Sequence, residues 1–192
     1  MLFHSHSNLE GKHAFLSPSS PYWLRYDDEK MTQRYNSWHA TEYGTRLHEF
    51  AKNAINLGIT LSNSKDTLSL YVNDCIRYKM SPEVLLYYSD NCFGTADAIA
   101  YYYNNEKNKY TLRIHDLKTG VTKAHMEQLM IYAALFCLEY DVDPKTIDII
   151  LVIYKDNKKD RCYPTGDDIL NIMELIELKD EFINRRLKAE GY

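Results

Sequence analysis

Residues 94–120 read GTADAIAYYYNNEKNKYTLRIHDLKTG, and this stretch decides the fold. Two segments rich in aromatic and branched residues, at about 93–103 and 110–117, flank the polar run 104–108. Segments of this composition separated by a short polar turn are typical of an antiparallel β-hairpin. The sequence therefore predicts two neighbouring strands joined through residues 104–108.

The register of this hairpin can be predicted from the position of its turn. A turn centred between Glu106 and Lys107 places Asp97 directly opposite Asp116 without a bulge. Side chains opposed in this way lie about 5 Å apart at Cβ. Lys118 follows Asp116 by two residues, so it shares the same face of the strand. We expect two carboxylates and one ammonium group to meet at one place.

Hydrophobic periodicity predicts the elements on either side of the hairpin. A strand at 84–88 precedes it, and the apolar run 146–154 is typical of a buried central strand. Residues 155–159 are expected to form a charged loop. The expected helices lie at about 42–57 with Thr41 as N-cap, 65–79, 122–139 with Thr122 as N-cap, and 165–188.

This order of elements predicts one α/β domain over residues 1–192, with a central mixed β-sheet flanked by helices. We expect 1–20 to be an N-terminal Ser-rich loop segment, 42–154 to form the catalytic core and 165–188 to be a C-terminal helix. A chain of 192 residues with 45% hydrophobic content can bury one sizeable core.

Composition excludes several classes of protein. A net charge of −4 argues against a protein that coats nucleic acid through bulk charge, although one local basic groove is compatible with it. The four cysteines form no CxxC pair, so neither a zinc knuckle nor a disulfide framework is indicated. No signal peptide or membrane-spanning run is recognisable, so we expect a soluble, cytoplasmic protein with no membrane partner.

Two opposed carboxylates with a neighbouring lysine can form a hydrolytic metal site. Asp97 and Asp116 would repel each other in apolar surroundings unless a cation neutralised them. Lys118 could orient or help to deprotonate a water molecule there. A bare D-x-K tripeptide is, however, more often an ordinary Asp-Lys pair on a solvated hairpin, and this alternative stays open for the tripeptide alone.

Four short motifs occur in order on the expected helix, strand, strand and helix. They are Gly44-Thr45-Arg46-Leu47-His48, Gly94 to Asp97, Asp116 to Gly120, and Gln128 to Tyr132. In this order they resemble the G-T-x-x-H, G-x-x-D, D-x-K-T-G and Q-x-x-x-Y motifs of the PD-(D/E)XK nuclease superfamily, in particular its RecB-like exonuclease branch, including phage and mobile-element members. The resemblance implies a restriction-endonuclease-like αβββαβ core.

The resemblance also implies roles for individual residues. His48, Asp97, Asp116 and the backbone carbonyl of Leu117 would bind the cation, and Lys118 would position the attacking water. Gln128 and Tyr132, which lie four apart on one helix face, would border the active site. Glu49 and His115 adjoin expected ligands but should point elsewhere because of the helical step and strand alternation.

The ligand set predicts the cofactor. Carboxylate and carbonyl oxygens suit Mg²⁺, and one imidazole makes Mn²⁺ also acceptable. Some RecB-like nucleases hold an iron-sulfur cluster, but only Cys137 and Cys162 follow Gln128, so we expect no such cluster here.

The expected function is hydrolysis of DNA phosphodiester bonds by a Mg²⁺- or Mn²⁺-dependent exonuclease that acts on DNA ends in recombination, repair or phage DNA processing. The 17 tyrosines could stack on unpaired bases, which makes single-stranded ends a candidate substrate. Two alternatives remain open: a structure-specific or foreign-DNA endonuclease of the same superfamily, and an inactive member that only binds nucleic acid or protein. Self-association and a recombination partner protein also remain open.

Overall fold

The computed structural model describes residues 5, 7–9, 11, 14–62, 65–120 and 125–191. The chain divides into two compact units, Met1–Arg46 and Leu47–Tyr192. The second unit contains the whole β-sheet. The expectation of a single domain over 1–192 stays a prediction.

The first unit contains two 3-10 helices, η1 (Ser7–Leu9) and η2 (Pro21–Arg25), and the first part of helix α1 (Asp28–Leu57). The predicted helix start at Thr41 is wrong. The Asp27 carboxylate accepts a hydrogen bond from the Lys30 N–H at 2.8 Å, as an N-cap does. Thr41 lies inside the helix, where its hydroxyl donates to the Ser37 carbonyl. The early turns of α1 are mostly polar, so no apolar periodicity marked them in the sequence.

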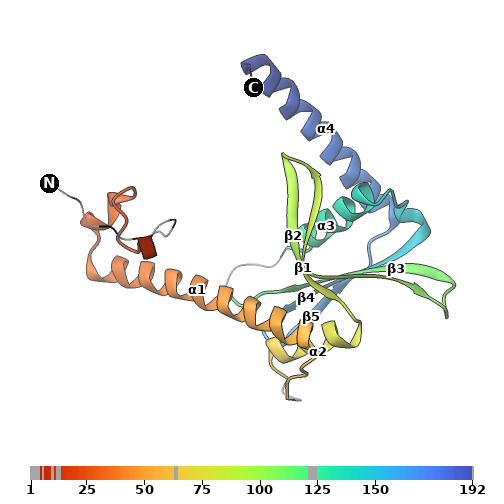
Figure 1. The fold of residues 1–192 in the computed structure, drawn as a ribbon, viewed down its shortest axis with the longest axis horizontal. Coiled ribbons are helices and arrows are strands. Elements are labelled where there is room, and N and C mark those ends of the chain that lie inside the picture. The colour runs from red at the N-terminus through yellow and green to blue at the C-terminus, as the bar shows by residue number, and fades with distance from the viewer. Residues whose placement is uncertain are drawn as a thin grey trace. The chain divides into compact units, whose positions relative to one another are not determined.

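The second unit is built on a five-stranded mixed sheet, shown in Figure 1. Its strands lie side by side in chain order, and only β3 and β4 run parallel to each other. The prediction of an α/β fold with a mixed sheet flanked by helices is confirmed. The strands are β1 (Ser81–Ser89), β2 (Cys92–Asn104), β3 (Lys109–Leu117), β4 (Ile147–Lys155) and β5 (Lys158–Cys162).

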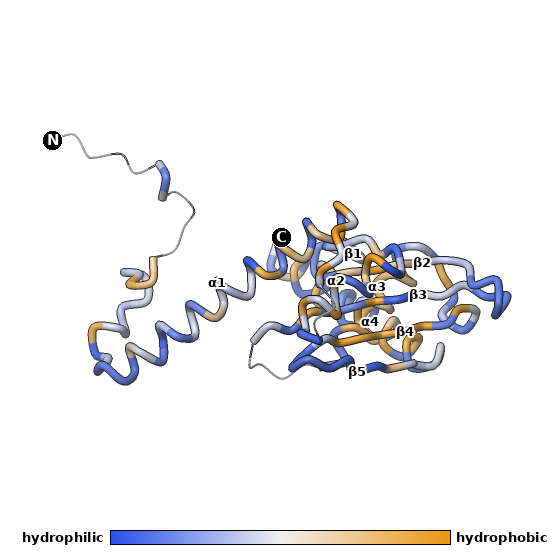
Figure 2. The backbone as a smooth tube through the Cα atoms, turned by 90° about the horizontal axis from the view of Figure 1, so that it is seen from below, coloured by the Kyte–Doolittle hydropathy of each residue, from blue (hydrophilic) through white to orange (hydrophobic). Residues whose placement is uncertain are grey.

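Helices cover the sheet through two separate hydrophobic clusters. The larger cluster packs α3 (Met126–Glu139) and α4 (Gly166–Glu190) against the strands. The second cluster packs α2 (Thr67–Arg77) and the last turns of α1 against the sheet. Figure 2 shows β4 as mainly hydrophobic and β5 as mainly hydrophilic, which agrees with a central strand beside an edge strand. A short 3-10 helix, η3 (Pro144–Thr146), leads into β4.

The register of β2 and β3 is the one that the turn position predicted. The pairs run without interruption from Ala98 opposite His115 to Asn104 opposite Lys109. Continuing this register by one residue places Asp97 opposite Asp116, and both residues belong to their strands. The hairpin therefore needs no bulge, because its polar turn is centred where the sequence indicated.

Other boundaries differ from the expected ones. The predicted loop at 155–159 is wrong: Asp156 and Asn157 form a two-residue turn, with φ values of 50° and 59°, that joins β4 to β5. Positive φ at both positions is typical of the turns that close β-hairpins. The helix expected at 122–139 is described from Met126, and its expected N-cap Thr122 lies outside the described residues. Among the described helices, none is long and apolar enough to span a membrane.

Candidate metal centre

Three carboxylates lie in one row across β1, β2 and β3. The register of β2 and β3 puts Asp116 opposite Asp97. On the other side of β2, Pro82 pairs with Ala98 and Val84 pairs with Ala96, which puts Glu83 opposite Asp97 as well. Directly opposed side chains lie about 5 Å apart at Cβ. The row of Glu83, Asp97 and Asp116, here called the acid row, therefore concentrates negative charge at one place in the sheet.

Asp116 is the most buried member of the acid row. Only 3% of the residue is exposed, and burial raises the pKa of its carboxyl while the Lys118 ammonium opposes that shift. Its Oδ1 accepts a hydrogen bond from Lys118 Nζ at 3.1 Å. Its Oδ2 has no hydrogen-bond partner among the described residues. A buried carboxylate oxygen without a partner costs free energy unless a proton or a cation occupies that position.

Asp97 lies between Asp116 and His48. Its Oδ2 accepts a hydrogen bond from the Leu117 N–H at 2.8 Å and lies 3.5 Å from Nδ1 of His48. Burial, followed by the charge of Asp116, raises the pKa of the Asp97 carboxyl to about 6. Burial thus raises the pKa of both facing carboxyls, and a cation bound between them would oppose that shift.

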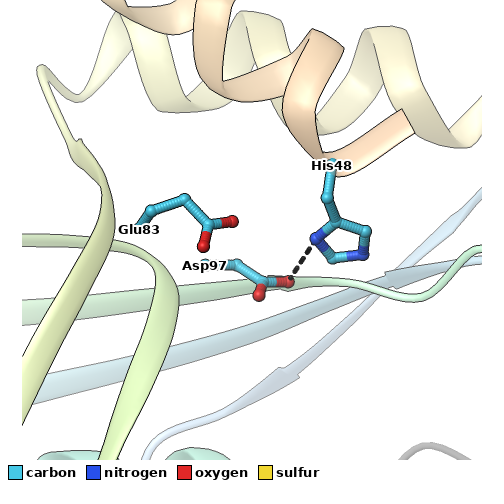
Figure 3. A group of neighbouring side chains, drawn as sticks. All are labelled: His48, Glu83 and Asp97. Atoms are coloured by element: carbon cyan, nitrogen blue, oxygen red, sulfur yellow. Dashed lines mark ion pairs between the residues drawn. The ribbon is translucent and has the colours of Figure 1, made fainter. Parts of the chain in front are cut away.

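Glu83 was missed by the sequence analysis. Each of His48, Glu83 and Asp97 offers one ligand atom within 4.8 Å of the other two. Figure 3 shows these three side chains converging from α1, β1 and β2. Glu83 has a φ of 53°, a conformation that non-glycine residues rarely adopt and that is often found at functional sites. The oxygen and imidazole ligands of this group suit Mg²⁺ or Mn²⁺.

Lys118 connects the acid row to α3. Its Nζ donates to Asp116 and, at 3.0 Å, to Oε1 of Gln128. The Gln128 amide in turn donates to the Tyr132 hydroxyl at 3.3 Å. Gln128 and Tyr132 lie on one face of α3 because they are four residues apart. The ammonium group is therefore held between a strand carboxylate and a helix amide.

The side chains expected at the site from the sequence form one connected group in the structure. His48 reaches Asp97, Asp97 faces Asp116, and Asp116 leads through Lys118 to the α3 pair. Leu117 contacts the group through its N–H, and the expected role of its carbonyl stays a prediction.

His115 points away from this group, as strand alternation predicted. Its ring is fully buried and its Nδ1 lies 3.1 Å from the Tyr154 hydroxyl. Burial lowers the pKa of this imidazole to about 3. His115 is therefore a neutral core residue.

The acid row does not lie in the large cavity of this unit. That cavity has a volume of about 1080 Å³ and is lined by residues further along β2, from Ile99 to Asn104, together with Tyr78, Phe136 and Tyr140.

Comparison of the chain with family models, with curated proteins and with solved structures finds no match.

Proposed function

We propose that this protein is a Mg²⁺- or Mn²⁺-dependent nuclease that hydrolyses DNA phosphodiester bonds, with a preference for DNA ends. One observation carries the proposal: the buried Asp116 Oδ2 has no partner among the described residues, while Asp97 faces it and Lys118 lies beside it. The resemblance of the four motifs to RecB-like nucleases supports DNA as the substrate and ends as its point of attack.

The donor set fits a divalent cation. Asp97, Asp116, His48 and Glu83 would hold it, three through oxygen and one through imidazole nitrogen. Such a cation polarises a phosphodiester and lowers the pKa of water. It would also neutralise the carboxylates whose pKa values burial raises.

The residues around the donor set would handle the substrate. Lys118 can offset the negative charge that develops on the phosphate in the transition state. Gln128 keeps the ammonium group beside Asp116, because it accepts a hydrogen bond from the same Nζ. Tyr132 in turn restrains the Gln128 amide.

The test combines cleavage with metal binding. End-labelled linear and covalently closed circular DNA, single- and double-stranded, are incubated with Mg²⁺, Mn²⁺ or EDTA, and Mn²⁺ binding is followed by calorimetry. We expect metal-dependent loss of linear DNA, and we expect Asp116→Asn to lose both cleavage and tight Mn²⁺ binding.

Asp148→Asn is the matched control, because Asp148 is a β4 carboxylate that pairs with Lys107 and Lys109, outside the acid row. If closed circles are cleaved as fast as linear DNA, the protein is an endonuclease and not an exonuclease. Mn²⁺ binding without cleavage of any substrate would favour an inactive binding protein.

A further inference from the structure

The outward face of the β1–β2 hairpin is apolar although it is exposed. Along this hairpin Val84, Leu86 and Ala96 pack into the larger hydrophobic cluster. Strand alternation turns the residues between them to the other side. These are Leu85, Tyr87, Phe93 and Thr95, here called the hairpin face, of which the first three are 55%, 45% and 59% exposed.

Two aromatic rings on the hairpin face are stacked. Tyr87 and Phe93 are paired in register, and their ring centroids lie 6.5 Å apart with an interplanar angle of 25°. Leu85 is paired with Thr95 next to them. The pair thus presents flat apolar surface to solvent on a strand hairpin.

The hairpin face leads directly to the acid row. Glu83 and Asp97 lie along the chain at a distance of two residues from Leu85 in β1 and from Thr95 in β2. Phe93 and Asp97 are four residues apart, which corresponds to roughly 13 Å along a strand. That length matches about four stacked nucleotides at roughly 3.4 Å each.

The hairpin is held in place at its turn. Ser89 and Asn91 donate hydrogen bonds to the Asp180 carboxylate on α4 at 2.6 and 2.8 Å, and Asn91 also donates to Asn184. The Tyr87 N–H donates to the Glu139 carboxylate at the end of α3. The aromatic pair therefore sits on a fixed support, so little conformational entropy would be lost on binding.

We propose that the hairpin face binds the unpaired bases of a DNA single strand whose phosphate lies at the acid row. This inference rests on the proposed nuclease function and names its substrate as single-stranded DNA. Exposed aromatic rings stack on any base whose face is free, whereas the faces of bases inside a duplex are covered by their neighbours. The four residues of the hairpin face carry no charge, so most of the affinity there comes from stacking and depends weakly on salt.

The test measures binding without cleavage. The full chain in EDTA is titrated into a single-stranded oligonucleotide that contains 2-aminopurine, whose fluorescence is quenched when the base stacks on an aromatic ring. We expect quenching by the wild type, and about 5- to 100-fold weaker binding by Phe93→Leu and by Tyr87→Leu. Phe93→Trp, which keeps an aromatic face, should retain both binding and quenching.

Tyr140→Ala is the matched control, since Tyr140 is a 54% exposed aromatic residue at the large cavity. Thermal unfolding of each variant tests whether the hairpin remains folded. The proposal is overturned if Phe93→Leu, while folded, binds single strands like the wild type, or if Tyr140→Ala weakens binding instead. If quenching depends on Phe93 but the protein cleaves no DNA, the hairpin face binds single strands and the proposed nuclease function is wrong.

Discussion

The Tyr132 ring lies against the backbone of Gly94: a Cβ atom built on Gly94 would be 3.0 Å from Cε1 of Tyr132. The absence of a side chain at Gly94, the glycine of the G-x-x-D motif, therefore leaves room for the ring of Tyr132, the aromatic residue of the Q-x-x-x-Y motif. Through Gln128 this ring also restrains the polar group around Lys118. A strand residue without a side chain thus contributes to the candidate site.

Gly94→Ala should displace the Tyr132 ring. Overpacking at such a contact costs about 1–3 kcal/mol, which exceeds the gain expected from replacing glycine in a strand. We expect a lower free energy of unfolding in urea and reduced cleavage through the disturbed Gln128 contact. The double variant Gly94→Ala/Tyr132→Leu should recover stability but not activity. If Gly94→Ala alone is as stable as the wild type, the Tyr132 ring moves aside without lowering the free energy of unfolding.

Asp97→Asn should change the pH dependence of stability in EDTA. The folded protein keeps the Asp97 proton up to a pKa of about 6, whereas the unfolded chain loses it near 3.8. The wild type therefore loses stability as pH rises from about 4 to about 6, and this loss persists at higher pH. The asparagine variant lacks this loss, so it should gain stability relative to the wild type across that range.

Urea unfolding of both proteins between pH 4 and pH 8 measures this difference. Saturating Mn²⁺ should reverse the order at pH 7, because binding to the folded wild type stabilises it. A stability difference that is constant with pH would contradict the raised pKa of Asp97.

His115→Leu should have the opposite effect on the pH profile. The His115 pKa is lowered to about 3 by burial, while the unfolded imidazole titrates near 6.5. As pH falls from about 6.5 to about 3, the unfolded state of the wild type binds a proton that the folded state does not, so stability falls. The variant lacks this titration and should lose less stability over that range. Equal slopes of the two unfolding profiles would show that His115 is protonated in the fold.

Lys118→Ala should abolish cleavage, whereas Gln128→Ala should lower it by about 10- to 100-fold, since it removes a group that acts by orienting another. Both variants should still bind Mn²⁺, because neither residue belongs to the donor set. Single-turnover cleavage and calorimetry separate the two properties. If Lys118→Ala cleaves DNA at the wild-type rate, Lys118 takes no part in the reaction.

His48→Ala and Glu83→Gln test two of the proposed metal ligands. His48 is partly exposed and contacts Asp97, so its loss should leave the fold intact. We expect each variant to bind Mn²⁺ about 10- to 100-fold more weakly, with activity partly recovered by excess Mn²⁺. If His48→Ala lowers the free energy of unfolding while the metal affinity of the folded protein is unchanged, His48 has a structural role instead.

The sequence by itself determined the register of β2 and β3 and hence the meeting of Asp97 with Asp116. That was possible because the polar turn has an identifiable centre and the ladder has no bulge, so residue numbers alone fix the pairing. The spacing of four residues likewise put Gln128 and Tyr132 on one helix face. Both relationships are local, and they follow from the geometry of a single hairpin and a single helix.

Tertiary structure alone decided the place of Glu83. A two-residue turn at Asp90 and Asn91, continued without interruption, would put Val84 opposite Asp97. The register instead shifts by one residue between Tyr87 and Ser89, which brings Glu83 to that position.

Ser89 and Asn91 beside this shift are hydrogen-bonded to α4, about 90 residues later in the chain. The approach of His48 to Asp97 also joins α1 to the sheet across a long stretch of sequence. Contacts of this kind depend on how helices pack against the sheet, and no spacing within a short motif encodes them.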